Sequence, residues 1–238
     1  MHRVIIIIPT LNEEKNITIL HKKIKKNKIK SDILFIDDNS SDNTRLEILS
    51  LKKKYSNIYF IFRGHKMGVG SAHKDGFKWA YKKKYNIAVT MDADGTHDPK
   101  YINKFIHLMK NYNIVSTTRF SSKKNMLNQW PLYRIFLTKV RHFLVSFFLN
   151  FSLDASGAFR CFDLKKVRLK DIMEAKDNGY SFFWESLFIL YRKKFKIYEH
   201  TIILPYRSIG RSKMRFYDIY YAFIYLLFIS IKRFFYFK

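Results

Sequence analysis

The sequence contains almost no cysteine and far fewer acidic than basic residues. Cys161 is the single cysteine among 238 residues, which excludes intramolecular disulfides and cysteine-based zinc sites and fits a reducing compartment. Asp and Glu number 19 against 45 Lys and Arg, so the formal net charge is +26 at pH 7. A chain this basic favours anionic partners, such as nucleic acid, lipid head groups or phosphorylated substrates. Its hydrophobic content of 47% excludes a disordered tail.

Two common nucleotide-binding signatures are also missing. A dinucleotide-binding fold needs G-x-G-x-x-G directly after its first strand, so that the backbone can approach a pyrophosphate. The corresponding loop here runs from Pro9 to Glu13 and contains no glycine, while Gly68 and Gly70 form a lone G-x-G after a later strand. No G-x-x-x-x-G-K-[ST] run occurs, which excludes a P-loop NTPase.

The first half of the sequence alternates short apolar runs with longer helical patterns. The first run, from Val4 to Ile8, ends at Pro9 and is shorter than the ~7–15 apolar residues of a secretory signal. Such alternation predicts an α/β fold in which helices flank a mostly parallel sheet. The expected strands are 4–8, 33–36, 58–62, 87–91, 114–118 and 197–204, and the expected helices are 12–27, 41–55, 70–84, 99–111 and 181–194.

Two later segments have the composition of membrane-interface helices. The apolar run from Phe216 to Ile231 includes Asp218 and falls short of the ~20 residues that a spanning helix needs. Its aromatic residues and the following Lys232 favour a helix in the membrane interface, with a short span or a buried packing helix as alternatives. Residues 132–151 are similarly rich in Leu, Phe and Val, and form either a second interfacial helix or an amphipathic core helix.

Polar and charged residues follow the expected strands where they end, which is where ligands bind in a parallel α/β sheet. Asp92 and Asp94 follow the fourth strand and are hard oxygen ligands that suit Mg²⁺ or Mn²⁺, whose remaining ligands commonly come from substrate phosphates. A helix cap or a solvated turn is the alternative for this pair. Asp38, after the second strand, is either a turn residue or an acceptor for a ribose hydroxyl or a base edge.

Short motifs occur in a characteristic order along the chain. They are Pro9-Thr10-Leu11-Asn12-Glu13, residues 36–44, 68–72 and 92–99, Thr118-Arg119-Phe120, Trp130 with Arg134, residues 154–160, Glu185 and residues 205–213. Together they resemble family 2 glycosyltransferases of the GT-A fold, and within that family the polyprenyl-phosphate glycosyltransferases such as dolichol-phosphate mannose synthases. The combination is specific, although each motif alone is not.

The resemblance implies a donor site at the first, second and fourth strand ends. The residues that line the base and ribose site would be Pro9, Leu11, Glu13, Ile36 and Asp38. The residues that hold the ribose, the diphosphate and a Mg²⁺ or Mn²⁺ ion would be Asp92, Ala93 and Asp94, with Asp94 the main metal ligand and Thr96 a weaker one.

The resemblance also implies a cationic acceptor site. Arg119 and Arg134 would hold the acceptor phosphate near the donor sugar, and together with Asp94 they form the expected catalytic set. Arg207 and Lys213 would close over the diphosphate. The alternatives are a plain surface charge for Arg119 and a solvated basic turn for Arg207 and Lys213.

The implied reaction is an inverting transfer of a sugar from a nucleotide diphosphate donor, GDP-mannose or a UDP-sugar, to a polyprenyl phosphate. All reactants are anionic, so cations must be aimed at them, whereas an ionised phosphate needs no strong general base. We expect a catalytic domain over residues 1–214, a membrane-interface helix over 215–238, and a membrane-associated enzyme whose active site faces the cytoplasm. We expect either a minimal form of the family or one that depends on a membrane-protein partner.

Three departures from the family pattern leave the base and the sugar open. Leu11 stands where an aromatic residue is usual, Gly95-Thr96 replaces a larger pair, and residues 121–125 replace a glycine-rich acceptor loop. One alternative is the same fold acting on a hydroxyl group, which needs a general base such as Glu185 or Asp154. A nucleic-acid-binding module is disfavoured, because RNA-recognition and zinc motifs are absent and acids cluster where nucleic acid would bind.

Overall fold

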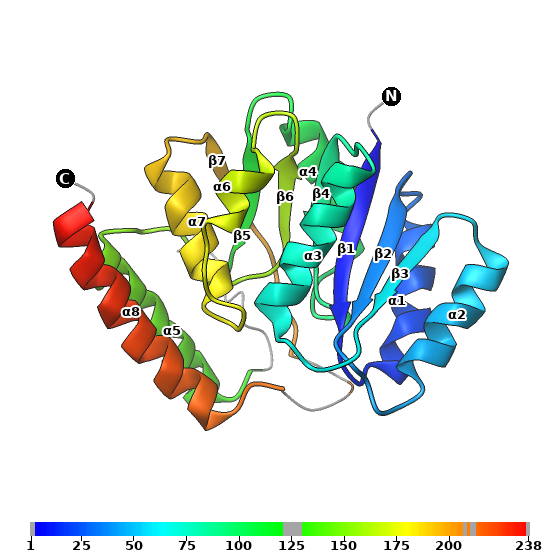
Figure 1. The fold of residues 1–238 in the computed structure, drawn as a ribbon, viewed down its shortest axis with the longest axis horizontal. Helices are drawn as coiled ribbons and strands as arrows, with labels where there is room; N and C mark the ends of the chain where they lie inside the picture. Colours follow the sequence, from blue (N-terminus) through cyan, green and yellow to red (C-terminus); the bar gives the residue numbers. More distant parts are fainter. Residues whose placement is uncertain (1–2, 121–129, 207–208, 210–212, 237–238) are drawn as a thin grey trace.

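The computed structural model describes residues 3–120, 130–206, 209 and 213–236. Within them, a seven-stranded sheet has the order β3-β2-β1-β4-β6-β5-β7 (Figure 1). The strands are β1 (Val4–Thr10), β2 (Asp32–Asp37), β3 (Ile58–Phe62), β4 (Ile87–Thr90), β5 (Ile114–Thr118), β6 (Arg160–Asp163) and β7 (Ile197–Thr201).

The strands run in one direction with a single exception among those described. β1 to β4 are parallel to one another, and β5 is parallel to β7, whereas β6 lies antiparallel between β4 and β5. The predicted mostly parallel sheet is therefore confirmed. β6 was not predicted as a strand, and the strand expected over residues 197–204 ends at Thr201.

The sequence of β1 explains why helices cover the sheet on both faces. Its residues from Val4 to Ile8 are all apolar, and alternate side chains of a strand point to opposite faces. Ile5 and Ile7 belong to one buried cluster, while Ile6 and Ile8 belong to the other, and all four are fully buried. An uninterrupted apolar run is what a parallel strand buried on both faces requires.

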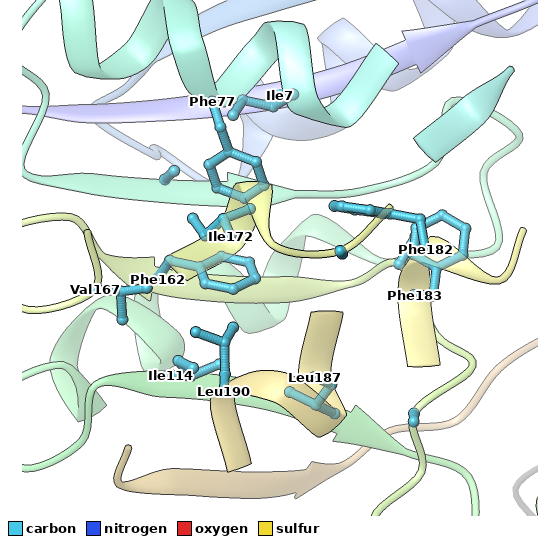
Figure 2. Close-up of a cluster of buried hydrophobic side chains, with 14 of the residues drawn as sticks. Ile7, Phe77, Ile114, Phe162, Val167, Ile172, Phe182, Phe183, Leu187 and Leu190 are labelled. Atoms are coloured by element: carbon cyan, nitrogen blue, oxygen red, sulfur yellow. The ribbon is translucent and has the colours of Figure 1, made fainter. Parts of the chain in front are cut away.

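The helices form a layer on each face of the sheet. α1 (Glu14–Lys26), α2 (Thr44–Lys54) and α4 (Ile102–Leu108), with a 3-10 turn at Pro99–Tyr101, cover the cluster that contains Ile6. α3 (Val69–Lys82), α6 (Leu169–Met173) and α7 (Phe182–Arg192) cover the opposite cluster. Figure 2 shows this second cluster, in which the ring of Phe77 from α3 meets the edge of Phe162 from β6 at 5.0 Å between centroids.

α5 (Leu132–Leu149) and α8 (Phe216–Tyr236) lie side by side at the edge of the molecule next to α7 (Figure 1). Both predicted helices are confirmed as helices. Each buries a few residues against the body, such as Leu149 and Leu226, but both also expose large apolar side chains. Among the described helices, none combines the length and the apolar character that crossing a membrane requires.

The contact between α3 and β1 depends on the absence of a side chain at Gly76. A Cβ at this position would lie 2.4 Å from Ile7 Cγ2 and 3.2 Å from Ile36 Cδ1, both in the fully buried core. We expect Gly76→Ala to lower the free energy of unfolding by about 1–3 kcal/mol, since overpacking outweighs the gain of ~1 kcal/mol in helix propensity. Urea unfolding of the purified protein measures this change.

Gly64→Ala is the matched control, because nothing lies within 4 Å of a Cβ at Gly64. We expect its free energy of unfolding to stay within about 0.5 kcal/mol of the wild-type value. A Gly76 variant that is as stable as the wild type would contradict the close approach of α3 to the sheet.

Candidate active site

Most of the predicted site residues lie along one edge of the sheet, where β1, β2, β4 and β5 end. Because β6 runs in the opposite direction, the preceding residues 154–159 reach the same edge. The Thr90 hydroxyl donates to the Ala158 carbonyl at 2.6 Å, and the Thr117 hydroxyl donates to the Phe159 carbonyl at 3.0 Å. We call this edge, comprising the four strand ends and residues 154–159, the rim.

Apolar residues of the expected base pocket come together at the ends of β1 and β2. Pro9 pairs with Ile36 across the two strands, and the Asp38 backbone N–H donates to the Thr10 carbonyl at 2.9 Å. Ile36 is fully buried, whereas Pro9 and Leu11 are partly exposed. The rim therefore offers accessible apolar surface here, which a planar base can contact.

The acids of this region are engaged within the protein. Asp38 is buried, and its carboxylate accepts hydrogen bonds from Arg63 Nη1 at 2.8 Å and from the backbone N–H groups of Met67 and Gly68 at 2.8 and 2.9 Å. Glu13 is also buried. Asp38 thus anchors the loop that leads into α3.

A cavity of about 380 Å³ borders the loop that Asp38 anchors. It lies between Met67 and Gly68, the loop at residues 176–179, and Tyr217, Asp218, Tyr221 and Tyr225 of α8. None of the predicted site residues lines this cavity.

The Asp92–Asp94 segment forms a tight turn at the end of β4. The Asp94 Oδ1 atom accepts hydrogen bonds from the Thr96 backbone N–H at 3.0 Å and from the Thr96 hydroxyl at 2.6 Å. Gly95 has a φ of +79°, a left-handed conformation that glycine adopts without strain. Ala93 points into the core at 3% exposure, while the Asp92 side chain is 40% exposed.

His97 connects this turn to the rest of the rim, a role that the sequence did not reveal. Its Nδ1 atom accepts a hydrogen bond from the Asp92 backbone N–H at 3.0 Å, so the ring is neutral with its proton on Nε2, and the ring stacks on Phe159. Burial lowers the pKa of His97 to about 4, with the charge of Asp94 opposing the shift and that of Arg119 adding to it. His97 therefore lies within electrostatic range of both Asp94 and Arg119.

Arg119 forms a buried, two-pronged ion pair with Asp154. Its Nε atom donates to Asp154 Oδ2 at 2.9 Å and its Nη2 atom to Oδ1 at 2.8 Å, and Nη2 also bonds the Ser156 hydroxyl. The side chains are 8% and 1% exposed. Burial opposes ionisation of Asp154, yet the charge and hydrogen bonds of Arg119 hold the pKa of this carboxyl well below its usual range. Arg119 is thus a fixed cation and not a plain surface charge.

The remaining predicted cations lie at other positions. Arg134, near the start of α5, places its guanidinium 5.5 Å from the centre of the Tyr206 ring. Lys213 Nζ donates to the Asn12 carbonyl at 3.0 Å, which brings this residue to the base side of the rim. Arg207 and residues 121–125 lie outside the described residues.

The carboxylates at the end of β4 fit a divalent cation that shares its ligands with a substrate. Within the described part of the chain, no cluster of three or more His, Cys, Asp and Glu residues can hold a metal ion alone. Asp92 and Asp94 offer hard oxygen ligands but too few for the six positions that Mg²⁺ prefers, so diphosphate oxygens would complete the set. Thr96 acts here as the hydrogen-bond donor that fixes the Asp94 carboxylate.

Comparison with known families decides the class of the protein. The sequence model described as Glycosyl transferase family 2 matches residues 5–197, which includes every strand of the rim. The chain belongs to glycosyl transferase family 2. The predicted family, fold class and enzyme class are therefore confirmed, and the protein is a glycosyltransferase.

Two curated members resemble this glycosyltransferase over most of its length. An undecaprenyl-phosphate mannosyltransferase of Micrococcus luteus is 28% identical over 213 residues, covering 89% of this chain and 87% of the relative. A polyprenol monophosphomannose synthase of Mycolicibacterium smegmatis is 26% identical over 216 residues, covering 89% and 81%.

Solved structures resemble this glycosyltransferase in fold. Glucosyl-3-phosphoglycerate synthase from Mycobacterium tuberculosis, in complex with Mn²⁺, UDP and glucosyl-3-phosphoglycerate, aligns with a TM-score of 0.61 at 15% identity, covering 97% of this chain and 78% of that one. A mannosyltransferase from Pyrobaculum calidifontis, in complex with GDP-mannose and Mn²⁺, aligns with a TM-score of 0.58 at 14% identity, covering 89% and 58%.

Two buried neutral histidines make the stability of this glycosyltransferase depend on pH. His73 of α3 is 1% exposed, packs against Phe182 and Phe183, and has no hydrogen-bond partner within the described residues. Burial lowers the pKa of His73 to about 3, and that of His97 to about 4. The contribution of each neutral histidine to the free energy of unfolding is complete above pH 6.5, which is about its pKa in the unfolded chain. It is lost as the pH falls toward the pKa in the folded chain.

When the pH falls from 7.5 to 5, we expect each histidine to lower the free energy of unfolding by about 2 kcal/mol. The reason is that the unfolded chain then binds a proton that the folded chain excludes. His73→Leu is expected to remove about half of the pH dependence that the two histidines cause. Urea unfolding at both pH values measures it, and an unchanged difference between them would contradict the burial of a neutral His73.

Proposed function

We propose that this glycosyltransferase transfers mannose from GDP-mannose to a polyprenyl phosphate at a membrane surface. One observation carries the proposal: the buried His97 ring joins the turn that holds Asp92 and Asp94 to the end of β5, because its Nδ1 atom accepts the Asp92 N–H and its ring stacks on Phe159, whose carbonyl accepts the Thr117 hydroxyl two residues before Arg119. A donor diphosphate and an acceptor phosphate can therefore meet there. The two curated relatives, named for polyprenyl-phosphate mannosyl transfer, support this choice of substrates.

The reaction is a single displacement at the anomeric carbon. An oxygen of the acceptor phosphate forms a bond to this carbon as the bond to the donor diphosphate breaks, so the configuration inverts and GDP leaves. Every participant is anionic, and fixed cations aimed at the phosphates lower the barrier. Arg119 supplies such a cation, because Asp154 and Ser156 hold its guanidinium in place.

The donor side of the rim carries carboxylates, whereas the acceptor side carries the guanidinium of Arg119. Pro9 and Leu11 contact the base in our proposal, whereas Ile36, predicted for the same pocket, is fully buried in the core beneath α3. Asp92 and Asp94 would hold a Mg²⁺ or Mn²⁺ ion. When bound, such an ion would supply positive charge to offset the negative charge that develops on the leaving diphosphate. Lys213, which already reaches the Asn12 carbonyl, is close enough to the base side to add a further positive charge.

The named candidates for a general base do not favour a hydroxyl acceptor. Asp154 is bound to Arg119 through both carboxylate oxygens. Glu185 is buried, and its carboxylate accepts hydrogen bonds from the backbone N–H groups of Lys176 and Asp177 at 2.9 Å and from the Tyr225 hydroxyl at 2.8 Å. A phosphate acceptor needs no such base, because it is already ionised at neutral pH.

Exposed apolar residues on α5 and α8 support membrane docking. Phe136, Phe143 and Phe147 of α5 are 64–69% exposed, and Tyr220 and Phe228 of α8 are also exposed. In a chain with a net charge of +26, such a surface suits an anionic bilayer. We therefore propose residues 1–214 as the catalytic domain and 215–238 as a helix at the interface, with the active site on the cytoplasmic side, where the single cysteine stays reduced.

The donor, the acceptor and the metal are tested together by Asp94→Asn. We expect purified wild-type protein with Mn²⁺ to move labelled mannose from GDP-mannose into a polyprenyl phosphate, measured as label in the organic phase. Asp94→Asn is expected to reduce this transfer about a hundredfold or more, because a neutral amide is a poor ligand for the cation.

Asp98→Asn is the matched control, since Asp98 lies in the same loop and caps the Pro99–Tyr101 turn through the Lys100 N–H at 3.0 Å. Its transfer rate is expected to stay within about twofold of the wild-type rate. Wild-type turnover by Asp94→Asn would remove the metal role, and transfer from UDP-sugars alone would remove GDP-mannose as the donor.

The membrane proposal is tested by Phe143→Ser combined with Phe147→Ser. Each phenylalanine contributes ~1.5–3 kcal/mol when it is fully buried in an apolar phase, so we expect binding to phosphatidylglycerol vesicles to weaken by about tenfold or more. Vesicle co-sedimentation measures the bound fraction. Leu46→Ser on α2, where Leu46 is 64% exposed, serves as the control. Equal losses in the two variants would contradict docking through α5.

A further inference from the structure

α5 has an inward face on which an arginine lies among buried residues. Thr138, Val145 and Leu149 are 8%, 5% and 1% exposed, and they recur at helical spacing along the side that packs on the body. Arg141 falls between Thr138 and Val145 in this series. Its side chain therefore starts from the inward face of α5.

Arg141 has no hydrogen-bond partner within the described residues at its Nε atom, and this atom is buried. Burial lowers the pKa of Arg141 to about 10, with the charge of Arg119 acting in the same direction and that of Asp154 opposing it. The geometry agrees, because the neighbouring His142 ring stacks on Phe120 at 4.2 Å between centroids and the Arg119 guanidinium lies 5.7 Å from the centre of the same Phe120 ring. The Asp154 carboxylate is occupied by Arg119 and accepts from the Ser156 hydroxyl as well, so it is already engaged by groups other than Arg141.

Other groups around this pair do not balance the second positive charge. His142 packs on Phe120, and burial lowers its pKa, so the ring is neutral near pH 7. Burial raises the pKa of Glu199, whose carboxylate accepts the Asp154 backbone N–H at 2.7 Å. Arg160, another cation that Asp154 acts on, bonds to the Ala155 and Phe183 carbonyls. The described residues around Arg119 and Arg141 therefore carry an excess of positive charge.

We propose that Arg141, together with Arg119, binds the phosphate of the lipid acceptor. Arg141 is partly exposed, so its guanidinium can be reached by a ligand, while its buried Nε atom lacks a partner within the described residues. An anionic ligand offsets the cost of such an unpaired buried donor on a charged group. A phosphate monoester suits two guanidinium groups, because each can donate two parallel N–H bonds to its oxygens. The inference rests on the proposed function and assigns a further residue to its acceptor side.

The position of Arg141 on α5 explains how a lipid can reach the rim. Phe143 and Phe147 of the same helix are 64% and 69% exposed on its outward side. Arg141 precedes Phe143 by two residues, a rotation of about 200° around the helix, so it starts from the opposite, inward side. A prenyl chain can therefore lie along the outer surface of α5 while its phosphate passes over the helix to the two arginines.

Arg141→Met tests this assignment, with Lys139→Met as the matched control, because Lys139 is an exposed residue of the same helix. In detergent, with farnesyl phosphate as the acceptor, we expect Arg141→Met to raise the acceptor KM about ten- to a hundredfold. The KM for GDP-mannose is expected to stay within about twofold. Lys139→Met is expected to leave both constants unchanged, and Arg141→Lys to restore part of the acceptor affinity, since it keeps the charge but loses the fork.

Two further measurements separate phosphate binding from a structural role. Calorimetric titration with farnesyl phosphate and with farnesol tests binding without turnover, and we expect the preference for the phosphate to decrease in Arg141→Met. The melting temperature is expected to stay equal or to rise, because an unpaired buried donor has been removed.

The outcomes distinguish this inference from the proposed function. A wild-type protein that transfers no mannose to any polyprenyl phosphate overturns the proposed function, and the titration still decides the role of Arg141. Equal phosphate preference in wild type and Arg141→Met overturns the inference alone. A lower melting temperature with both KM values raised also overturns it, because Arg141 would then be a structural residue.

Discussion

The rim depends on the buried ion pair between Arg119 and Asp154. It joins the end of β5 to the segment that leads into β6, which is 35 residues later in the sequence. Taking two charges out of water is expensive, and such a pair persists only where hydrogen bonds are well directed. Here Nε, Nη2 and the backbone N–H of Arg119 all donate to Asp154. The pair therefore fixes the electrostatic potential that His97, Arg141 and His142 experience.

Around this pair, the charges of opposite sign are separated along the sheet. Carboxylates follow β2 and β4, whereas guanidinium groups follow β5 and lie on the inward face of α5. The acidic side can hold a phosphate only through a metal ion, while the basic side can hold one directly. A substrate with a diphosphate and a substrate with a single phosphate would therefore bind at different ends of the same rim. His97, neutral and buried between the two sides, keeps the Asp92 backbone in place without adding charge.

Helices and strands that are stabilised mainly by their own residue pattern can be predicted from the sequence. The five strands of the first half were found from uninterrupted runs such as Val4–Ile8, because both faces of a parallel strand are buried. β6 was missed, since Arg-Cys-Phe-Asp has no such pattern, and its arginine is buried only because Ala155 and Phe183 supply carbonyl partners. The Asp92–Asp94 pair was found from its place after a strand. The positions of His97 and Arg141 depend on residues that distant segments bring near them, so no local pattern reveals them.

The antiparallel position of β6 affects the order in which the sheet can form during synthesis. β4 and β5 are not neighbours, and each reaches a partner on that side only when residues 160–163 enter between them. Until then both strands present open edges, and β5 also waits for β7 on its other side. In a chain that emerges from the ribosome, β1 to β4 can therefore form before the part of the rim that contains Arg119 and Asp154. The rim is completed by the last strands to be synthesised, and interruption of synthesis before residue 160 leaves an edge prone to aggregation.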